Sequence, residues 1–360
     1  MTEAANTRPT LAAVAARAGV SASTASLVFS GAGPVSEATR ERVLAAASEL
    51  DYAGPDPTAR SLRRGRTGVI GVVTEDTLAE AFRDPINLAL LDGLGDELSD
   101  DGYGLLVLPW RPDSRADLAA APMDGAILLG CSADLARSVE LLQRRRIPLV
   151  AIEAPEMPDV IRVDLDNAEA TRRGAEHLRE LGHERVAIVA LPLDVGRSRG
   201  PLDEAREAAG TAYTATERIR GAREVFPAAG GVTAAASTVS EGRIAGLTLL
   251  DAPAASRPTA IIAQSDLLAA GVIHAAEELG IAVPGELSVL GFDGVRLDGL
   301  TEHTLTTLVQ PAVEKGRAAA RALRSALAGD PPDPVHLTSE LRIGTTTATA
   351  LAPASVPSPL

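Results

Sequence analysis

The sequence predicts an α/β protein in which a small helical unit precedes a body built on two parallel sheets. Two patterns support this class: three short helical stripes fall within the first 54 residues, and later residues alternate short apolar runs with helical stripes. The length of 360 residues also exceeds the size at which one hydrophobic core keeps growing. We therefore expect the last 280 or so residues to form two doubly wound lobes that face each other across a cleft.

The N-terminal helices are marked by residues that start and stop helices. Thr10 can cap a first helix, Gly19 can end it, and Ser21 and Ser36 can cap a second and a third. Two helices joined by so short a turn predict a helix-turn-helix, whose second helix enters the major groove of DNA by its N-terminal end. A generic three-helix bundle or a capping subdomain is the alternative.

Residues 55–67 predict a linker that could fold on DNA. Pro55 and Pro57 favour a stiff extended joint, and the helix that could follow is too short to be stable alone. On DNA, Arg60 and Arg63 could meet phosphates while Leu62 acts as an apolar wedge in the minor groove. The alternative is a solvated basic linker.

Three motifs in this region closely resemble the lactose-repressor/galactose-repressor (LacI/GalR) family. They are Thr10-Leu11-x-x-Val14-Ala15-x-x-Ala18-Gly19-Val20-Ser21-x-x-Thr24-x-Ser26, Val35-Ser36-x-x-Thr39-Arg40-x-x-Val43 and Ala59-Arg60-Ser61-Leu62. The resemblance implies a DNA-binding headpiece at residues 1–54 and a hinge helix within 55–67. The candidate DNA contacts are Thr10, Arg17, Ser21, Ala22, Ser23, Ser26, Leu27, Thr39, Arg60, Leu62 and Arg63.

This chain departs from the family at the positions that read bases. Family members often place Tyr, Gln or Arg there, whereas the matching residues are Ala22, Ser23 and Leu27. Ala and Leu offer only apolar contact, and Ser reads bases ambiguously. We therefore expect few hydrogen bonds to base edges, and more of the sequence specificity should come from the hinge and from DNA deformability.

The body should be built from β-α-β units. The expected strands are Val69–Val73, Leu105–Leu108, Ala126–Leu129, Leu149–Ile152, Val186–Val189, Ala260–Ala263 and Val289–Phe292, and Leu90, Leu91, Leu94 and Leu98 form a helical stripe between the first two. The family resemblance continues in Asp124-Gly125-Ala126-Ile127-Leu128, Val163-Asp164-x-Asp166-Asn167, Leu287-Ser288-Val289-Leu290-Gly291-Phe292-Asp293 and Thr306-Thr307-Leu308-Val309-Gln310-Pro311.

That resemblance implies a two-lobed periplasmic-binding-protein-like fold in which the chain crosses between lobes near Asn167, Gln310 and Leu337. The expected body spans residues 68–350, with one lobe at about 68–167 and 311–336, the other at about 168–310 and 337–350, and a disordered tail at 351–360. Residues 192–217 are longer than the family's usual connection and could form an exposed helix, a cleft flap or a solvated loop.

Candidate effector residues follow the expected strands. Asp293 and Arg218 match the family's ligand-binding residues, although a capping aspartate and a solvated arginine are the alternatives. Ser265 and Asp266 stand where the family usually shows Asn-Asp. Phe82, Asp84 and Phe292 complete the set, and either Phe could equally line the core. Sugars or related metabolites are the expected effectors, although aromatic residues make up only 2% of the chain.

Charge and composition narrow the function classes. The net charge is -14, yet the first 67 residues hold eight Arg against six acids, so the remainder carries -16. A basic N-terminal arm on an acidic body is compatible with DNA binding. The single Cys131, the missing export pattern and the lack of 18 consecutive apolar residues predict a cytoplasmic protein without a membrane partner. Five scattered His residues favour no metal, and we expect no cofactor.

Two rival functions fit the sequence less well than a repressor does. Gly196-Arg197-Ser198-Arg199-Gly200 fits the nucleophile elbow of serine hydrolases, but Pro192 and Asp194 separate it from the preceding apolar run. A solute-binding protein should carry an export signal and lack a headpiece. We therefore expect no enzyme, but a transcription regulator that binds an inverted-repeat operator as a homodimer or dimer of dimers.

Overall fold

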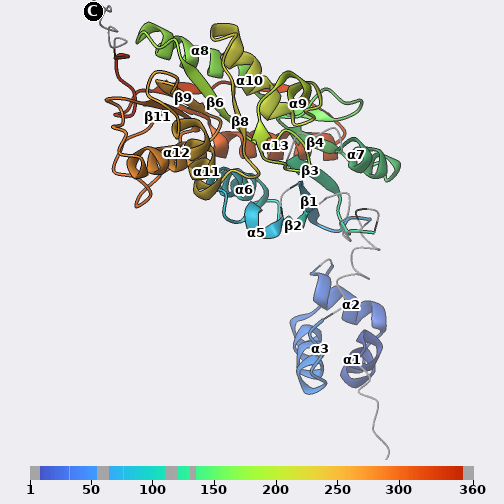
Figure 1. Ribbon diagram of the computed structural model, residues 1–360. Coiled ribbons are helices and arrows are strands. Elements are labelled where there is room, and N and C mark those ends of the chain that lie inside the picture. The colour runs from blue at the N-terminus through green and yellow to red at the C-terminus, as the bar shows by residue number, and fades with distance from the viewer. Residues whose placement is uncertain are drawn as a thin grey trace, which may run out of the picture. The chain divides into compact units, whose positions relative to one another are not determined.

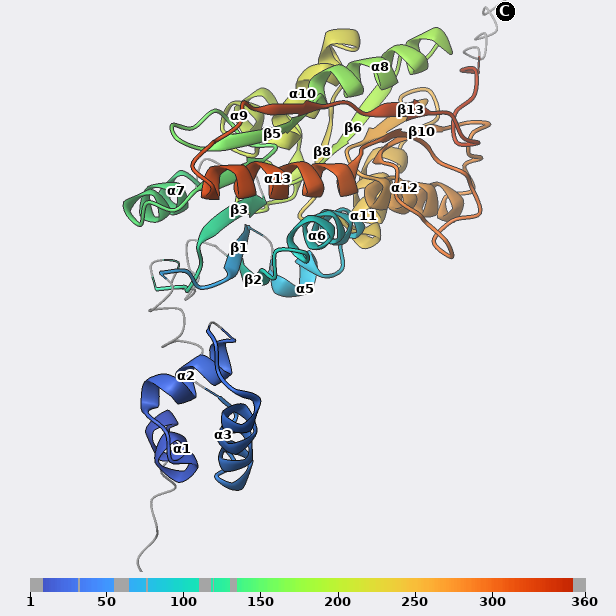
Figure 2. The ribbon, with the colours of Figure 1, turned by 180° about the vertical axis from the view of Figure 1, so that it is seen from behind.

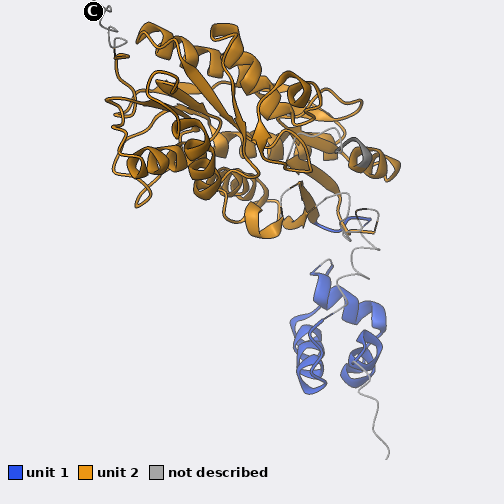
Figure 3. Cartoon of the chain, in the orientation of Figure 1, with its two compact units in different colours: residues 1–68 blue, residues 69–360 orange. Residues whose placement is uncertain are grey.

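The computed structural model describes residues 9–31, 33–54, 65–75, 77–109, 118, 120–129 and 135–351. The chain separates into two compact units, residues 1–68 and residues 69–360, which are coloured separately in Figure 3. The expected hinge helix, with Arg60, Leu62 and Arg63, lies outside the described residues, as do residues 352–360 of the expected tail.

The described residues of the first unit form three helices: α1 (Leu11–Ala18), α2 (Ala22–Ser30) and α3 (Glu37–Glu49) (Figure 1). Each follows a hydroxyl residue whose side-chain oxygen accepts a backbone N–H from the first turn, and these caps are Thr10, Ser21 and Ser36. Gly19 adopts a left-handed conformation with φ of +65°. Because glycine enters that region without steric cost, the chain can turn by 106° between α1 and α2.

The first unit has a small core of its own. The residues that α1, α2 and α3 bury against one another are Val14, Ala15, Ala18, Ala25, Val28, Val43, Ala46 and Ala47. Phe29 and Tyr52 close one side of this core in an edge-to-face contact with ring centroids 5.5 Å apart. The three stripes predicted from the sequence therefore share one core.

The second unit contains two sheets. The first is wholly parallel in the order β12-β5-β4-β3-β1-β2. Its strands are β1 (Val69–Thr74), β2 (Gly104–Pro109), β3 (Gly125–Leu129), β4 (Leu149–Ile152), β5 (Ile161–Leu165) and β12 (Val335–Leu337). The central strands β3 and β4 are buried along their whole length, as their apolar sequences predict.

The second sheet has the order β13-β11-β10-β9-β6-β8-β7, with both edge strands antiparallel to their neighbours. Its strands are β6 (Val186–Ala190), β7 (Gly200–Pro201), β8 (Gly231–Thr233), β9 (Ala260–Ala263), β10 (Ser288–Asp293), β11 (Thr306–Val309) and β13 (Glu340–Arg342). The α/β class with a helix-turn-helix unit and two mainly parallel sheets is therefore confirmed.

Helices cover the faces of both sheets (Figures 1 and 2). They are α5 (Leu78–Ala81), α6 (Pro85–Leu98), α7 (Leu135–Arg144), α8 (Asn167–Glu180), α9 (Glu204–Ala208), α10 (Tyr213–Val225), α11 (Val239–Leu250), α12 (Asp266–Glu278) and α13 (Ala312–Leu327). Helices α6 and α13 pack closely at Gly93, where a Cβ would lie 2.0 Å from the carbonyl oxygen of Val313. A side chain at position 93 would therefore force the two helices apart.

The chain crosses between the two sheets three times. It leaves the first sheet after β5, returns with α13 after β11, and crosses again between β12 and β13. Helix α13 packs against β3, β4 and β5, so residues far apart in sequence complete one lobe. Figure 2 shows α13 lying along that sheet beside α6.

The long connection at residues 192–217 contains β7, α9 and the start of α10. Its first residues line a cavity in the second unit, while α9 buries none of its residues, so the segment has features of both the cleft flap and the exposed helix that the sequence left open. Within the described residues, no single helix is long and apolar enough to cross a bilayer, whereas α1 and α2 would pass that test only as a bent pair.

Candidate DNA-binding face and candidate effector cavity

The exposed face of α2 carries the residues expected to read DNA. Ala22, Ser23 and Leu27 are exposed, while Ala25 and Val28 on the opposite face are buried. This division follows from the helical period, because the same helix must both fill the core and present a surface. The three exposed side chains offer one hydroxyl and two apolar groups to a base edge.

Hydroxyl groups cluster at the start of α2. The Oγ of Ser21 lies 2.8 Å from the Oγ of Ser23 and 2.9 Å from the Oγ1 of Thr24. Ser21 also accepts the backbone N–H of Thr24, so it positions the first turn of the helix. A helix N-terminus surrounded by hydroxyls can hold a phosphate oxygen.

The remaining expected contacts lie on the helix ends and on the surface. Thr10 and Thr39 stand at the starts of α1 and α3, where the Oγ1 of Thr39 lies 2.9 Å from the Oγ of Ser36. Arg17 on α1 forms an exposed ion pair of 2.6 Å with Glu49 on α3. Its guanidinium group therefore also joins two helices of the unit. Ser26 is half-buried in the middle of α2.

A cavity of about 250 Å³ lies between the two lobes of the second unit. It opens at the carboxyl ends of the strands, where Thr74, Leu129 and Ile152 come from the first sheet and Ser265 and Asp293 from the second. Ligands of open α/β sheets bind outside the carboxyl ends of strands. The volume is just below the usual range of small-molecule sites, about 300–1,000 Å³.

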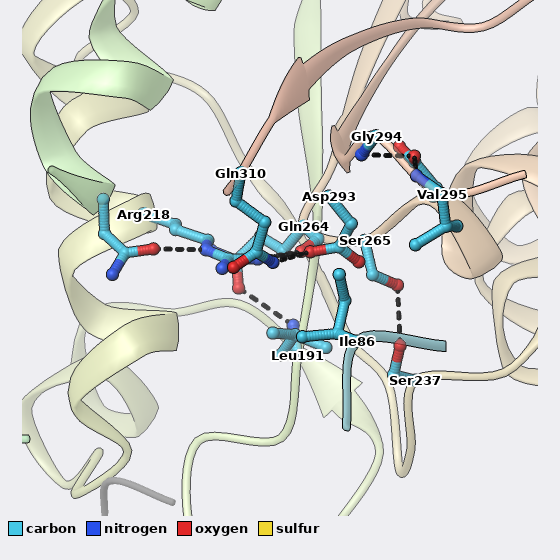
Figure 4. Close-up of polar contacts among 12 residues, drawn as sticks. Ile86, Leu191, Arg218, Ser237, Gln264, Ser265, Asp293, Gly294, Val295 and Gln310 are labelled. Carbon is cyan, nitrogen blue, oxygen red and sulfur yellow. Dashed lines mark hydrogen bonds and ion pairs between the residues drawn. The ribbon is translucent and has the colours of Figure 1, made fainter. Parts of the chain in front are cut away.

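Arg218 on α10 lies at the base of this cavity and is almost completely buried (Figure 4). Its Nε donates to the side-chain oxygen of Asn167 at 2.8 Å, and its Nη1 donates to the backbone carbonyl of Gln264 at 2.5 Å. The guanidinium plane lies 3.5 Å from the ring centre of Phe292. These contacts fix both the position and the plane of the cation.

Asp293, at the end of β10, faces Arg218 across 3.7 Å. Its backbone has φ of +126°, a conformation that residues with a side chain rarely adopt and that is concentrated at functional sites. The side-chain amide of Gln310 donates to its carboxylate at 2.6 Å. Burial raises the pKa of Asp293 well above its ordinary value, and the negative charges of Asp266 and Asp84 add to the rise, while Arg218 opposes it.

A buried ion pair supports the base of the cavity. Lys315, the only lysine of the chain, is fully buried in α13 and donates to the carboxylate of Glu153 and to the side-chain oxygen of Gln310. The other carboxylate oxygen of Glu153 accepts the side-chain amide of Asn167 at 2.6 Å. Burial alone would raise the pKa of Glu153, but Lys315 and Arg218 together hold it below the ordinary value.

Four of the seven expected effector residues meet at the cavity: Asp84, Arg218, Ser265 and Asp293. Asp84 caps α6 by accepting the N–H of Ile86 at 2.8 Å, and Ser265 caps α12 while accepting the hydroxyl of Ser237 at 2.8 Å. Each of these two side chains therefore caps a helix and also lines the cavity.

The structure does not bring Phe82, Asp266 and Phe292 to the cavity lining. Phe82 ends α5 with about half of its surface exposed, because that helix is a single short turn on the outside of its lobe. Phe292 lies beneath Arg218, where it supports the guanidinium group. Phe82 thus lines neither the cavity nor the core.

Asp266 lies fully buried at the start of α12 and organises the loop after β10. Its carboxylate accepts the backbone N–H groups of Gly294 at 2.8 Å and Val295 at 2.9 Å, and the hydroxyl of Thr307 at 2.5 Å. Burial raises its pKa to about 7, although these three hydrogen bonds oppose the rise. Asp266 therefore acts on the site by holding the backbone that follows Asp293.

Arg197 joins the two lobes at the cavity. It lies in the connection after β6, and its Nη1 is 3.1 Å from the carboxylate of Glu80 on α5, while its Nη2 donates to the carbonyl of Glu75 at 3.5 Å. Sequence reasoning missed this contact, along with Glu153, Asn167 and Lys315. Two features of the sequence could have pointed to these residues: Lys315 is the only lysine of the chain, and Glu153 directly follows an apolar run that predicts a buried strand.

The hydrolase motif lacks the backbone that its chemistry requires. Ser198 lies in an irregular segment, eight positions after Ala190, the last residue of β6, and Pro192 and Asp194 lie between them. A nucleophile elbow needs strand, turn and helix in immediate succession. Within the described residues, no group of three His, Cys, Asp or Glu side chains could hold a metal ion.

Two family models match different parts of the chain. Residues 10–54 match the family described as "Bacterial regulatory proteins, lacI family", and residues 175–347 match a "Periplasmic binding protein-like domain". The chain is 34% identical over 337 residues to an HTH-type transcriptional regulator of Mycolicibacterium smegmatis, covering 88% of this chain and 90% of the relative.

Two further proteins extend the comparison. The HTH-type transcriptional repressor CytR of Escherichia coli strain K12 is 30% identical, with 90% of this chain and 91% of the relative covered. The solved structure of a transcriptional regulator CelR-cellobiose complex is 27% identical, with a TM-score of 0.64 over 94% of this chain and 100% of that one. The chain is thus a DNA-binding transcriptional regulator, and it belongs to the LacI family of bacterial regulatory proteins.

Proposed function

We propose that this regulator is a repressor whose affinity for an inverted-repeat operator is controlled by a small molecule bound between the lobes. The observation that carries the proposal is the cavity that contains Arg218 and Asp293, in the same chain as a helix-turn-helix unit. The repressor acts in the cytoplasm as a homodimer or a dimer of dimers, so that two headpieces match the two halves of the operator.

In this proposal the headpiece divides its contacts between phosphates and bases. Thr10, Ser21, Ser26 and Thr39 supply hydroxyls to the phosphate backbone, as Arg17 supplies charge. Ala22, Ser23 and Leu27 face the base edges. The hinge residues Arg60, Leu62 and Arg63 add phosphate contacts and a wedge in the minor groove.

The effector proposed for the cavity is a sugar or a related metabolite. The solved CelR relative is described as a complex with cellobiose, which supports a hydroxyl-rich ligand. Buried Asp293 and Ser265 can bond hydroxyl groups, and Leu129 and Ile152 supply apolar surface. No aromatic ring belongs to the described lining, so the ligand is held by polar and aliphatic contacts.

Control requires that the effector bind the free and the DNA-bound states with different affinities. The cavity is lined from both lobes, and the chain crosses between these lobes three times. A ligand that changes the angle between the lobes would therefore act on the segments that connect them. The same coupling would allow DNA to change effector affinity by an equal factor.

The test begins with the operator. Selection of bound sequences from a random DNA pool should return a near-palindrome, and the affinity of the protein for it should change when an effector found by thermal shift is added. Recovery of DNA without two-fold symmetry, or an effector that leaves DNA affinity unchanged, would contradict the proposal.

Variants then separate the two sites. Leu62→Ala should reduce operator affinity and DNA bending without changing effector binding. Asp293→Asn should weaken effector binding while leaving the protein folded, because asparagine keeps the size of the side chain. Asp203→Asn, at the exposed cap of α9, is the matched control and should change neither property.

A further inference from the structure

Six buried side chains form a closed ring of polar contacts at the base of the cavity. Each is at most 9% exposed, and in ring order they are Asp293, Gln310, Lys315, Glu153, Asn167 and Arg218. Consecutive members are joined by hydrogen bonds, and the ring closes where Nη1 of Arg218 lies 3.7 Å from the carboxylate of Asp293. Lys315 and Asn167 are not among the described residues that line the cavity, whereas the other four are.

Gln310 connects the two lobes inside this ring. It follows β11, where the chain crosses from the second lobe, which holds the second sheet, to the first lobe, which holds the first sheet. Its side-chain oxygen accepts a hydrogen bond from Lys315 on α13 of the first lobe, and its amide nitrogen donates to Asp293 on the second lobe at 2.6 Å. Because an ammonium group can only donate, the oxygen must face Lys315 and the NH₂ group must face Asp293.

Asn167 makes the matching connection at the crossing after β5. Its side-chain oxygen accepts Nε of Arg218 on the second lobe at 2.8 Å, and its amide nitrogen donates to Glu153 on the first lobe at 2.6 Å. Each lobe therefore supplies one basic and one acidic side chain, and each amide lies between groups from different lobes. Because the hydrogen bonds of a buried network polarise one another, a change at one member alters the strength of the others.

Lys315 carries this ring into the packed interior of the first lobe. It is fully buried on α13, which packs against β3, β4 and β5. The next residue, Gly316, lies so close to α6 that an added Cβ would overlap the carbonyl oxygen of Leu90. Strand β3 pairs with β1, which begins at Val69, directly after the N-terminal unit. Lys315 is thus attached to the tightly packed lobe that the chain joins to the headpiece.

We propose that Lys315 is a positioning residue that couples the effector cavity to α13. This inference rests on the proposed function, because it takes Asp293 as a residue that binds the effector. An effector hydroxyl that donates to Asp293 shares the carboxylate with Gln310 and weakens the bond between those two side chains. Gln310 then follows Lys315, so the change reaches α13 and the first lobe. By reciprocal linkage, a movement of α13 changes how Asp293 is presented to the effector.

The single lysine of the chain makes this relay from Asp293 through Gln310 to Lys315 directly observable. Full-length protein made with lysine labelled with ¹³C at its ε-carbon gives one lysine signal in a proton–carbon correlation spectrum, that of Lys315. Asp293→Gly removes the acceptor of the Gln310 amide, and glycine tolerates the φ of +126° at this position. The Lys315 signal should therefore shift. Asp203→Gly, at the exposed cap of α9, is the matched control and should not shift it.

A substitution of Gln310 separates the relay from the direct electric field of Asp293. Gln310→Met keeps the length of the side chain, removes both of its polar groups and leaves Lys315 paired with Glu153. In this background, Asp293→Gly should shift the Lys315 signal by less than about half as much as in the natural chain, since residues of one network are not additive. Gln143→Met on α7, outside the ring, should leave the full shift.

The spectra decide the relay independently of the proposed function. An equal shift in the natural and Gln310→Met backgrounds overturns the proposal, because the field of Asp293 would then act without Gln310. Absence of a shift in the natural background also overturns it, because a lysine that only neutralised Glu153 would not respond to Asp293. Both results leave the repressor function standing.

Sugar binding supplies a second measurement that needs no substitution in the ring. Glucose, galactose, ribose and cellobiose are added in turn to the natural protein, and thermal shift identifies those that bind. A sugar that binds should shift the Lys315 signal, and the change that it causes in operator affinity should be at least about threefold smaller in Gln310→Met.

The sugar results separate the relay from effector control. A sugar that alters operator affinity without shifting the Lys315 signal overturns the relay alone. A sugar that shifts the signal without altering operator affinity supports the relay and contradicts effector control. Binding by none of the four contradicts the proposed sugar effector, and the Asp293→Gly spectra then decide the relay by themselves.

Discussion

Replacing Lys315 with methionine should destabilise the second unit by about 3–5 kcal/mol, the usual cost of breaking a buried ion pair. Lys315 is fully buried, and its ammonium group donates to Glu153 and Gln310. Methionine fills most of the same volume but leaves the carboxylate of Glu153 buried with only Arg218 as a cation nearby, 4.0 Å away. The loss therefore comes from an uncompensated charge and not from a cavity.

The loss of unfolding free energy in Lys315→Met, relative to the natural chain, should depend on pH. In the natural chain the pKa of Glu153 is lowered in the folded state, so its contribution to stability is present above the ordinary value of 4.5 and is lost as pH falls through the folded pKa. Without Lys315, burial raises that pKa, so the variant gains relative stability when Glu153 is protonated. The difference between the two proteins should therefore begin to shrink above pH 4.5, where Glu153 of the variant becomes protonated, and should go on shrinking as pH falls below 4.5.

Urea unfolding followed by far-ultraviolet circular dichroism measures this difference. Arg317→Met is the matched control on the same helix, because Arg317 forms an exposed pair with Asp96 at 2.7 Å that should contribute about 0–1 kcal/mol. Adding Glu153→Gln to Lys315→Met should recover at least half of the loss. The reasoning would be refuted if Lys315→Met lost no more unfolding free energy than Arg317→Met, or if the double variant were less stable than Lys315→Met alone.

Three further predictions concern the cleft, the loop after β10 and helix packing. Arg197→Met should weaken effector binding by about 1.5- to 5-fold in calorimetry, because a partly exposed pair such as Arg197 with Glu80 contributes about 0.2–1 kcal/mol. Unchanged affinity would count against the contact between the lobes. Burial raises the pKa of Asp266 to about 7, so the protonated carboxyl group stabilises the folded state fully at acid pH and this contribution is lost as pH rises to 7. Asp266→Asn should therefore flatten the fall in melting temperature between pH 4 and 7. An equally steep fall in the variant would contradict this. Gly93→Ala should cost about 2 kcal/mol or more through overpacking against α13, whereas Gly95→Ala, with open space around it, should stabilise α6 by about 0.5–1 kcal/mol in the same urea assay.

Local signals were sufficient to predict the elements of the fold. Thr10, Ser21 and Ser36 cap their own helices through backbone groups only three residues away. The buried parallel strands are continuous apolar runs, so their positions can be read without knowing their partners. The two-residue strand β7 had no such signal, because Gly200 and Pro201 are common in turns.

The site was only partly predictable because its contacts join distant parts of the chain. Lys315 and Glu153 are 162 positions apart, and nothing near either residue indicates the pairing. Arg218 and Asp293 could be predicted from the family resemblance, although not the network that holds them. Phe82 failed as a cavity residue since α5 turns it outward, an orientation that depends on tertiary structure.

The crossing of the chain between lobes also sets the order in which a newly made chain can fold. The headpiece core is complete once Tyr52 has left the ribosome, whereas the first lobe lacks α13 and β12 until Leu337 has been made. Because domains fold as units during synthesis, DNA-binding parts exist well before the effector-binding parts. A message cut short near its end would therefore yield headpieces that no small molecule can regulate.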